Sequence, residues 1–247
     1  MFEIHLPSID STNTYAKQNV SQFPKHGITC ITADHQTAGR GRFHNKWISP
    51  PNVNLYITFF FQLPLLQRDF TALGLVLASS MTKVLQSYGI KAHIKWPNDL
   101  FLKGKKFGGV LTETSVQKEI FDVFAGIGVN VNMDKEALQN IEPPATSLMI
   151  ETGKQWDRKE LLKKLQLQFE QDLDLFHKEG FTPFHSYCDA ILAYKGEKVR
   201  CFDGKQEWIG ICKSLALDGK LNVELKDHTI HALASGEIHL RKLGNHT

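Results

Sequence analysis

The stretch Gly-Arg-Gly-Arg-Phe-His-Asn-Lys-Trp, residues 39–47, alternates two glycines with two arginines before a polar and aromatic flank. Glycine lets backbone N–H groups approach a ligand closely, and successive N–H groups in such a turn form an anion-binding concavity. Arginine adds a planar cation that binds phosphate or carboxylate through two parallel hydrogen bonds. The stretch therefore suits a phosphate or an acyl phosphate, although a solvated basic loop or a nucleic-acid patch would give the same local pattern.

A second stretch, Lys-Trp-Pro-Asn-Asp at residues 95–99, closes a short strand that we predict over 91–95. Pro97 fixes φ, and Asn98 and Asp99 are common turn residues. The pattern fits a plain β-turn beside a buried tryptophan. It fits equally a turn that directs Asn98 and Asp99 into a site at the end of the strand.

A basic turn, Lys-Gly-Lys-Lys at residues 103–106, follows a few residues later. Three lysines in four residues usually mean a solvated turn. Because Lys106 begins a predicted strand over 107–113, and side chains alternate along a strand, we expect Lys106 to point inward. Lys103 and Lys105 should stay in solvent.

Four motifs in order resemble the biotin protein ligases, that is, the biotin–[acetyl-CoA-carboxylase] ligases, over the whole chain. They are Asp-Ser-Thr-Asn at 10–13, Gln-Thr-Ala-Gly-Arg-Gly-Arg at 36–42, Lys-Trp-Pro-Asn-Asp at 95–99 and Lys-Phe-Gly-Gly at 106–109. One Gly-Arg-Gly-Arg alone would be weak support, but four motifs with fitting order and spacing make the resemblance specific. The chain departs from the family at Phe43, His44 and Asn45, where a more glycine- and arginine-rich run is common.

The resemblance implies an α/β (α+β) fold in two domains. Residues 1–190 should form a catalytic domain like that of class II aminoacyl-tRNA synthetases and biotin/lipoate ligases, with a mixed sheet and flanking helices. Residues 191–247 should form a small SH3-like β-barrel. The pattern of the residues agrees, since Asp-Gly turns at 203–204 and 218–219 separate short apolar runs after Ala190, as in a small barrel.

Hydrophobic periodicity predicts the main elements of the first domain. Alternation predicts strands over 53–61 and 120–132, and apolar residues at steps of three and four predict helices over 69–88 and 158–178. A short helix over 14–20 would have Ser11 or Thr12 near its N-terminus as a cap. On the strand 120–132, Gly126, Gly128 and Asn130 share one face, where glycines leave a flat floor for a planar ligand or a neighbouring backbone.

The resemblance also implies a two-step acyl transfer. The carboxylate of biotin attacks the α-phosphate of ATP, which releases pyrophosphate and leaves biotinyl-5′-AMP. The ε-amine of a lysine on the biotin carboxyl carrier protein of acetyl-CoA carboxylase then attacks the mixed anhydride and releases AMP. ATP, Mg²⁺ and biotin as the substrate are the expected small molecules. Both nucleophiles come from substrates, so the absence of a Ser-His-Asp or Cys-His arrangement fits.

By the same resemblance, the catalytic residues are expected to be Lys106, Arg40, Arg42 and Asp99. Asp99 could accept a proton from the acceptor lysine or contact Mg²⁺ through phosphate or water, and the metal ligands themselves are not identified. Ser11, Thr12 and Asn13 should contact the ureido ring, and Arg241 should reach the ATP phosphates. The full expected binding set is Ser11, Thr12, Asn13, Gln36, Gly39, Arg40, Gly41, Arg42, Trp47, Lys95, Asn98, Lys106, Gly108, Gly128, Asn130 and Arg241.

Composition narrows the class of protein. Lys and Arg total 29 against 26 Asp and Glu, and the resulting net charge of +3 is too small to argue for nucleic acid. The chain has no signal-peptide pattern and no apolar stretch long enough to span a bilayer, so we expect a cytoplasmic protein without a membrane partner. The cysteines have no zinc-ligand spacing and should be reduced thiols, although Cys201 and Cys212 could pair across a hairpin.

Three other functions deserve comparison. A lipoate or octanoate ligase shares the fold and chemistry, but the pairing of Gly-Arg-Gly-Arg with Lys-Trp-Pro-Asn-Asp argues against it. A biotin-responsive repressor would need an N-terminal winged helix, for which the motif at 10–13 leaves no room. A non-catalytic biotin-binding module would not need Lys106, Arg40 and Arg42. A homodimer through an exposed sheet edge is left open.

Overall fold

The computed structural model describes residues 1–65, 70–117, 119–139, 141–142, 144–202, 206–234 and 239–242, with the backbone alone at 44, 70 and 239–242. Its elements are β1 (Phe2–Leu6), α1 (Thr12–Gln18), η1 (Val20–Gln22), β2 (Thr29–Ala33), η2 (Arg42–His44), β3 (Leu55–Pro64), η3 (Phe70–Ala72), α2 (Leu73–Gln86), β4 (His93–Lys95), β5 (Asp99–Leu102), β6 (Lys105–Gln117), β7 (Ile120–Val129), α3 (Lys135–Leu138), α4 (Leu148–Thr152), α5 (Arg158–Glu179), α6 (Thr182–Ala190), β8 (Lys198–Phe202), β9 (Glu207–Leu215), β10 (Leu221–Glu224), β11 (Ile230–Leu233) and β12 (His239–Lys242).

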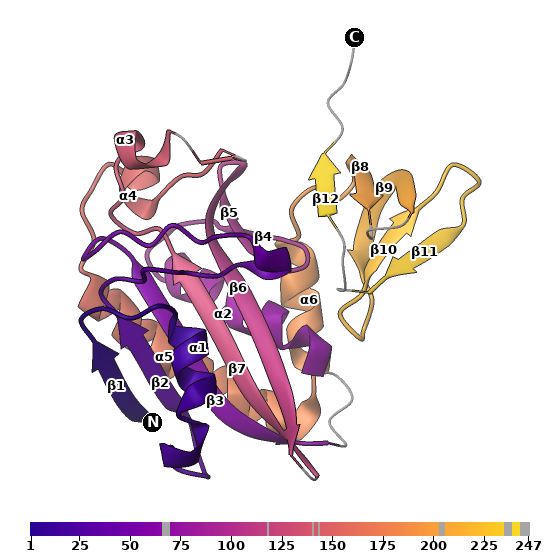
Figure 1. The fold of residues 1–247 in the computed structure, drawn as a ribbon. Coiled ribbons are helices and arrows are strands. Elements are labelled where there is room, and N and C mark those ends of the chain that lie inside the picture. The colour runs from indigo at the N-terminus through magenta and orange to yellow at the C-terminus, as the bar shows by residue number, and fades with distance from the viewer. Residues whose placement is uncertain are drawn as a thin grey trace.

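Two sheets organise the chain (Figure 1). The first has seven strands in the order β1-β2-β3-β7-β6-β5-β4, and the second has five in the order β11-β10-β9-β8-β12. Within the first sheet β1 and β2 run parallel, whereas the other neighbours are antiparallel. The mixed sheet with flanking helices and the small antiparallel sheet after it confirm the predicted fold class. The domain boundary at Ala190 stays a prediction.

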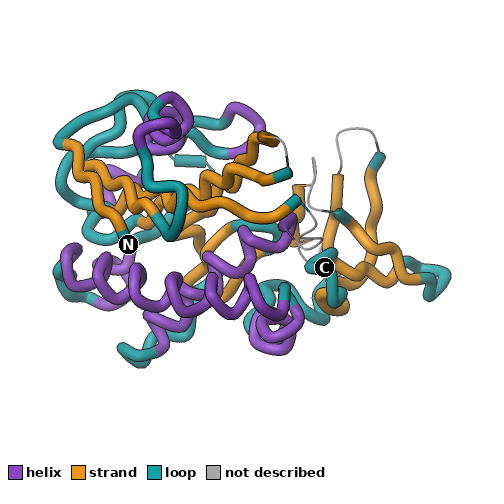
Figure 2. The backbone as a smooth tube through the Cα atoms, turned by 90° about the horizontal axis from the view of Figure 1, so that it is seen from below, coloured by secondary structure: helices purple, strands orange, loops and turns teal. Residues whose placement is uncertain are grey.

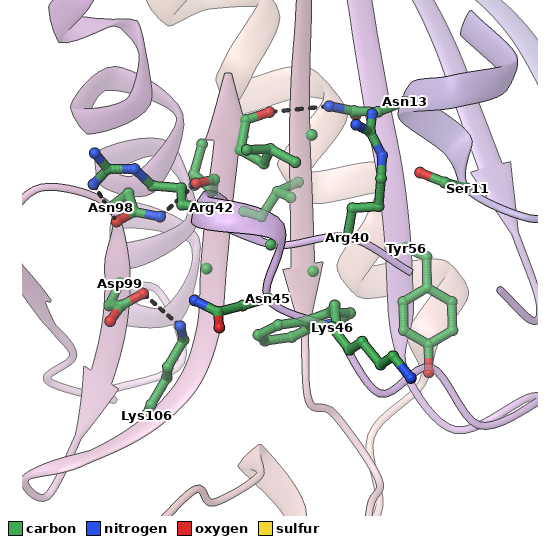
Figure 3. Close-up of a pocket in the computed structure, with 18 of the residues that line it drawn as sticks. Ser11, Asn13, Arg40, Arg42, Asn45, Lys46, Tyr56, Asn98, Asp99 and Lys106 are labelled. Atoms are coloured by element: carbon green, nitrogen blue, oxygen red, sulfur yellow. Dashed lines mark hydrogen bonds and ion pairs between the residues drawn. The ribbon is translucent and has the colours of Figure 1, made fainter. Parts of the chain in front are cut away.

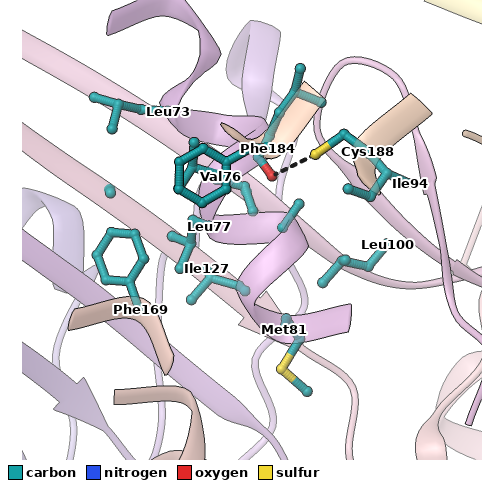
Figure 4. Close-up of a cluster of buried hydrophobic side chains, with 14 of the residues drawn as sticks. Leu73, Val76, Leu77, Met81, Ile94, Leu100, Ile127, Phe169, Phe184 and Cys188 are labelled. Atoms are coloured by element: carbon teal, nitrogen blue, oxygen red, sulfur yellow. Dashed lines mark hydrogen bonds between the residues drawn. The ribbon is translucent and has the colours of Figure 1, made fainter. Parts of the chain in front are cut away.

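One face of the seven-stranded sheet carries the main core. Most of the helical turns lie on this side of the strands (Figure 2), where α2, α5 and α6 pack. Leu77 and Met81 of α2, Phe169 of α5 and Phe184 of α6 are buried in one hydrophobic cluster with Ile127 of β7 (Figure 4). Alternation along β7 explains the division, because residues of one parity enter this core and residues of the other face away.

The opposite face of the same sheet is covered by α1. A small second core joins Ala16 and Phe23 to Ile31, Phe60 and Phe124 of the strands. Beyond Phe124 the same face of β7 carries Gly126 and Gly128, which have no side chains to extend that core. The face is therefore closed by α1 at one end and left for a cavity at the other.

Side-chain caps mark the N-termini of α3, α4 and α5 but not those of α1, α2 and α6. α5 begins after Asp157, whose carboxylate accepts the N–H groups of Lys159 and Glu160, and it ends at Gly180 with φ +67°, close to the predicted 158–178. α2 is shorter than the predicted 69–88, because a 3₁₀ turn precedes it. The predicted capping of α1 by a hydroxyl is wrong: Ser11 occupies the N-cap position but makes no side-chain cap hydrogen bond.

The second sheet is anchored beside the turn at 95–99. The predicted turn at Asp218-Gly219 is confirmed, with φ +81° at Gly219, whereas Asp203-Gly204 lies outside the described residues. The indole Nε1 of Trp96 donates to the carbonyl oxygen of Gly219 at 3.0 Å. A Cβ at Gly219 would lie 3.0 Å from Cβ of Ala72, so the turn is packed against the start of α2.

The four cysteines are free and buried, as the expectation of reduced thiols required. None of the helices in the described part of the chain is long and apolar enough to cross a membrane.

Candidate functional site

A cavity of about 230 Å³ opens on the sheet face that α1 leaves uncovered. It lies between the start of α1, the loop 36–47, the turn 95–99 and the glycine-bearing parts of β6 and β7. The predicted site residues that line it are Ser11, Thr12, Asn13, Gln36, Arg40, Gly41, Arg42, Trp47, Lys95, Asn98, Asp99, Lys106 and Gly128. Segments more than a hundred residues apart in the chain therefore meet in one place.

Three of the predicted residues do not line this cavity. Gly39 lines a second cavity of about 650 Å³, which shares much of the loop with the first. Gly108 packs against the backbone, since a Cβ there would lie 2.9 Å from the carbonyl oxygen of Gly128. Asn130 is buried and donates to the carbonyl oxygen of Thr146 at 3.1 Å. Their binding roles, and that of Arg241, whose side chain lies outside the described residues, remain predictions.

The end of the cavity at α1 is a preorganised set of neutral polar groups. The N–H of Thr12 donates to Oε1 of Gln36 at 2.9 Å, and Nε2 of Gln36 donates to Oγ of Ser49 at 3.0 Å. The hydroxyl of Thr58 lies 2.8 Å from Oγ1 of Thr12 and 2.5 Å from Oδ1 of Asn13. These buried groups hold one another in fixed orientations, which suits recognition of a small uncharged polar ring.

The opposite end is cationic (Figure 3). Nζ of Lys106 lies 2.6 Å from Oδ1 of Asp99, and Nζ of Lys95 lies 3.9 Å from Oδ2. Arg42 donates from Nη1 to Oδ1 of Asn98 at 3.3 Å. Burial lowers the pKa of Arg42, although the charge of Asp99 opposes the shift. Three cations against one carboxylate leave this end suited to an anion.

Burial confirms the predicted split of the lysine turn. Lys106 is partly buried, whereas Lys103 and Lys105 are exposed. The lysine that points inward is therefore the one beside Asp99.

The loop between the two ends is a small hairpin. The N–H of Trp47 donates to the carbonyl oxygen of Gly39 at 2.9 Å, and that of Gly41 donates to the carbonyl oxygen of Asn45 at 2.7 Å. Phe43 stands at the tip with φ +55°, a region that favours glycine. Cζ of Arg42 lies 4.8 Å from the centroid of the Phe43 ring, so the departure from a glycine-rich tip supplies an aromatic platform for an arginine.

The predicted glycine floor on β7 is occupied by side chains of the site itself. A Cβ at Gly126 would lie 2.4 Å from Oδ1 of Asn13, and one at Gly128 would lie 2.5 Å from Nε1 of Trp47. The indole N–H of Trp47 is buried and has no acceptor among the described residues. The glycines thus make room for the two side chains that contact the floor, and Trp47 brings an aromatic surface to the cavity.

Several residues at the site escaped prediction. Asn45, Lys46 and Tyr56 line the cavity, and Thr58 and Glu113 contact residues that line it. Thr58 interrupts the apolar run of β3 with an aliphatic hydroxyl and pairs opposite Gly126. A polar residue within an apolar strand is the signal that could have marked Thr58 as part of the site. Glu113 contacts Asn13 and Arg40, but nothing local distinguishes it from a surface glutamate at the end of a strand.

No cluster of three or more His, Cys, Asp or Glu side chains that could hold a metal ion occurs in the ranges that the structure describes. Among the described residues that line the cavity, Asp99 alone has a carboxylate, and Lys106 and Lys95 already form ion pairs with it.

The sequence of this chain is similar to a known protein family and to characterised relatives. Residues 5–130 match the Biotin/lipoate A/B protein ligase family. The bifunctional ligase/repressor BirA of Escherichia coli is 34% identical over 238 residues, which cover 96% of this chain and 73% of that protein. A biotin–[acetyl-CoA-carboxylase] ligase of Mycobacterium tuberculosis is 27% identical, over 87% of this chain and 80% of that one.

A solved structure extends the likeness to the fold. The biotin protein ligase of Aquifex aeolicus in complex with biotin and ATP superposes with a TM-score of 0.83 at 32% identity, covering 98% of this chain and 99% of that one. The shared sequence, the fold and the meeting of all four motifs in one cavity lead to one conclusion. The chain belongs to the biotin/lipoate A/B protein ligase family.

Proposed function

We propose that the protein is a biotin protein ligase that forms biotinyl-5′-AMP from biotin and ATP and then transfers biotin to a lysine of a carrier protein. The observation that carries the proposal is the two-ended cavity: neutral polar groups from α1 at one end, and Lys106 with Arg42 at the other. The ends match the two parts of biotin, an uncharged ureido ring and a carboxylate joined by an aliphatic chain.

The first step brings two anions together. The carboxylate of biotin attacks the α-phosphorus of ATP, and the bond to the leaving pyrophosphate breaks. Such a reaction depends mainly on positioning and on positive charge around the developing negative charge. Lys106 is held by Asp99 and Arg42 by Asn98, so both cations are in place before the substrates arrive and need little reorganisation.

The second step needs a deprotonated lysine from the acceptor. Its amine attacks the acyl carbon of the mixed anhydride, and AMP leaves with the bonding electrons. Among the described residues that line the cavity, Asp99 carries the sole carboxylate. We assign to it the acceptance of the amine proton. We assign the acceptor to the biotin carboxyl carrier domain of acetyl-CoA carboxylase, in line with the name of the related mycobacterial ligase.

Magnesium fits this cavity as part of the nucleotide substrate. Mg²⁺ typically keeps several waters and is held by phosphates with one or two carboxylates. The described lining of the cavity offers one carboxylate, that of Asp99, which two lysines already contact. We infer that Mg²⁺ is carried by the ATP phosphates and that the protein contributes at most a water-mediated contact from Asp99.

The test is a labelling assay with four arms: biotin or lipoate, each with ATP and Mg²⁺, and each with or without a biotin carboxyl carrier domain. A mass increase of the carrier in the biotin arm, and none in the lipoate arm, supports the proposal. An increase with lipoate instead would reassign the ring end of the cavity to another acyl group. No modification in any arm, with pyrophosphate release also absent, would leave the chain a binding module rather than an enzyme.

A further inference from the structure

One carboxylate accepts hydrogen bonds from two of the segments that enclose the cavity, the start of α1 and the loop 36–47. Glu113 of β6 accepts a fork from Arg40, with Nη2–Oε2 at 2.7 Å and Nη1–Oε1 at 3.3 Å. Nδ2 of Asn13 donates to Oε2 at 2.9 Å, and Nζ of Lys17 lies 2.6 Å from Oε1. Asn13 and Arg40 line the first cavity, Arg40 also lines the second, and Glu113 lines only the second of the two.

The orientation of the Asn13 amide depends on this carboxylate. Nδ2 also donates to the carbonyl oxygen of Leu111 at 3.2 Å, and Oδ1 lies 2.5 Å from the hydroxyl of Thr58. A flipped amide would set its oxygen against two acceptors on β6 and lose both hydrogen bonds. Glu113 therefore helps to hold the Asn13 amide with Oδ1, rather than Nδ2, closest to Gly126.

The same carboxylate anchors the arginine loop to the sheet. Burial alone would raise the pKa of Glu113, but hydrogen bonds from Lys17 and Asn13 and the charges of Lys17 and Arg40 outweigh it and lower the pKa. Glu113 is thus ionised at neutral pH. A two-pronged arginine–carboxylate contact is stronger and more directional than a single ion pair, and its side chains are only partly exposed, at 39% for Arg40 and 20% for Glu113.

We propose that Glu113 is a positioning residue that joins the ring-binding end of the cavity to the arginine loop. The assignment of biotin to that end rests on the proposed function. Because Asn13 and Arg40 share one carboxylate, a ligand that stabilises the orientation of Asn13 also stabilises the docked loop, and the docked loop in turn favours the ligand. Glu113 itself contacts no substrate.

The test compares Glu113→Gln with Lys17→Met. The carboxylate of Glu113 accepts from Asn13, Lys17 and Arg40 through two oxygens. A glutamine would keep one acceptor oxygen and would turn an NH₂ donor toward the remaining donors. We expect Glu113→Gln to weaken biotin binding about tenfold, the effect of losing one hydrogen bond to a charged group. We also expect saturating biotin no longer to slow hydrogen exchange of the backbone amides over 39–47.

Lys17→Met is the matched control, because Lys17 contacts the same carboxylate but lines neither cavity. It should lower the melting temperature while leaving biotin affinity and loop protection as in the wild type. Equal effects of the two variants would reduce Glu113 to a purely structural role. So would wild-type affinity and loop protection in Glu113→Gln.

Two further results are informative. A wild-type protein that does not bind biotin at all would overturn the proposed function, whereas binding unaffected by Glu113→Gln would overturn only the present inference. If the glutamine variant does not fold, Glu113→Asp gives the same measurement. Its carboxylate, shorter by one methylene, cannot reach Asn13 and Arg40 together, and it should show a partial loss of both affinity and loop protection.

Discussion

Lys106 is the residue whose charge the first step needs most directly. It is fixed by Asp99 at one end of the cavity, and it faces the position that we assign to the reacting carboxylate and phosphate. Lys106→Met should lower the rate of pyrophosphate release on the order of 100-fold. Removal of one preorganised hydrogen-bond donor that stabilises transition-state charge has an effect of this size in other enzymes.

Lys105→Met is the control for that change, because the neighbouring side chain is exposed and carries the same charge. It should retain wild-type activity. Equal losses in the two variants would show that the general basic character of the turn matters rather than the inward-pointing lysine.

The cysteine side chains give a prediction about pH. Burial raises the pKa of Cys30, Cys188 and Cys201 to about 12 and that of Cys212 to about 11, against about 8.5 for a free thiol. Because folding raises these values, the stability that the neutral thiols contribute is present below the free-thiol pKa. It is lost as the pH rises from there towards 12.

A thiol-reactive disulfide reagent at pH 8 should therefore detect almost no thiol in the native protein and four after denaturation. Two after denaturation would mean that Cys201 and Cys212 had paired after all.

At the scale of elements, the absence of side chains at two positions of β7 shapes the site. Gly126 and Gly128 leave room for Asn13 and Trp47. Gly126→Ala would place a Cβ 2.4 Å from Oδ1 of Asn13, so the amide must move. We expect the KM for biotin to rise about tenfold or more, since a misplaced buried hydrogen-bonding group costs about 1–3 kcal/mol.

Gly74→Ala provides the matched control. A Cβ there meets nothing nearer than 3.7 Å, and alanine is favoured over glycine within a helix such as α2. This variant should keep its activity and melt slightly higher. Unchanged biotin kinetics in Gly126→Ala would mean that the amide of Asn13 has no part in binding.

The elements also show what a sequence can and cannot predict. The helix over 158–178 was predictable because the apolar spacing, Asp157 and Gly180 all indicate the same ends. The hairpin of the loop 39–47 was not, since its hydrogen bonds join backbone groups of residues without any strand pattern. The motifs indicated which segments form the site. Periodicity carries no information on hydrogen bonds between residues as distant in the chain as Asn13 and Glu113.

At the scale of the whole molecule, the second sheet supports the turn that carries Asn98 and Asp99. Trp96 is fully buried and donates to Gly219 of that sheet. Trp96→Phe removes the donor, and we expect a loss of about 1 kcal/mol, or roughly 2–4 °C in melting temperature for a chain of this size. Because the turn is shared with the cavity, adenylation should slow as well.

Trp156→Phe separates the two effects. Its indole Nε1 donates at the same distance, 3.0 Å, to Oγ1 of Thr152, away from the cavity. It should lower the melting temperature without changing adenylation. A Trp96→Phe variant with full activity would indicate that the second sheet stabilises the chain without positioning the site.

The central claim is that the cavity between α1 and the turn 95–99 activates biotin with ATP. The most direct measurement is biotin-dependent exchange of labelled pyrophosphate into ATP without any acceptor protein. The account predicts exchange with biotin, none with lipoate, and a loss on the order of 100-fold in Lys106→Met. Absence of exchange in the wild type, or exchange that Lys106→Met leaves intact, would contradict it.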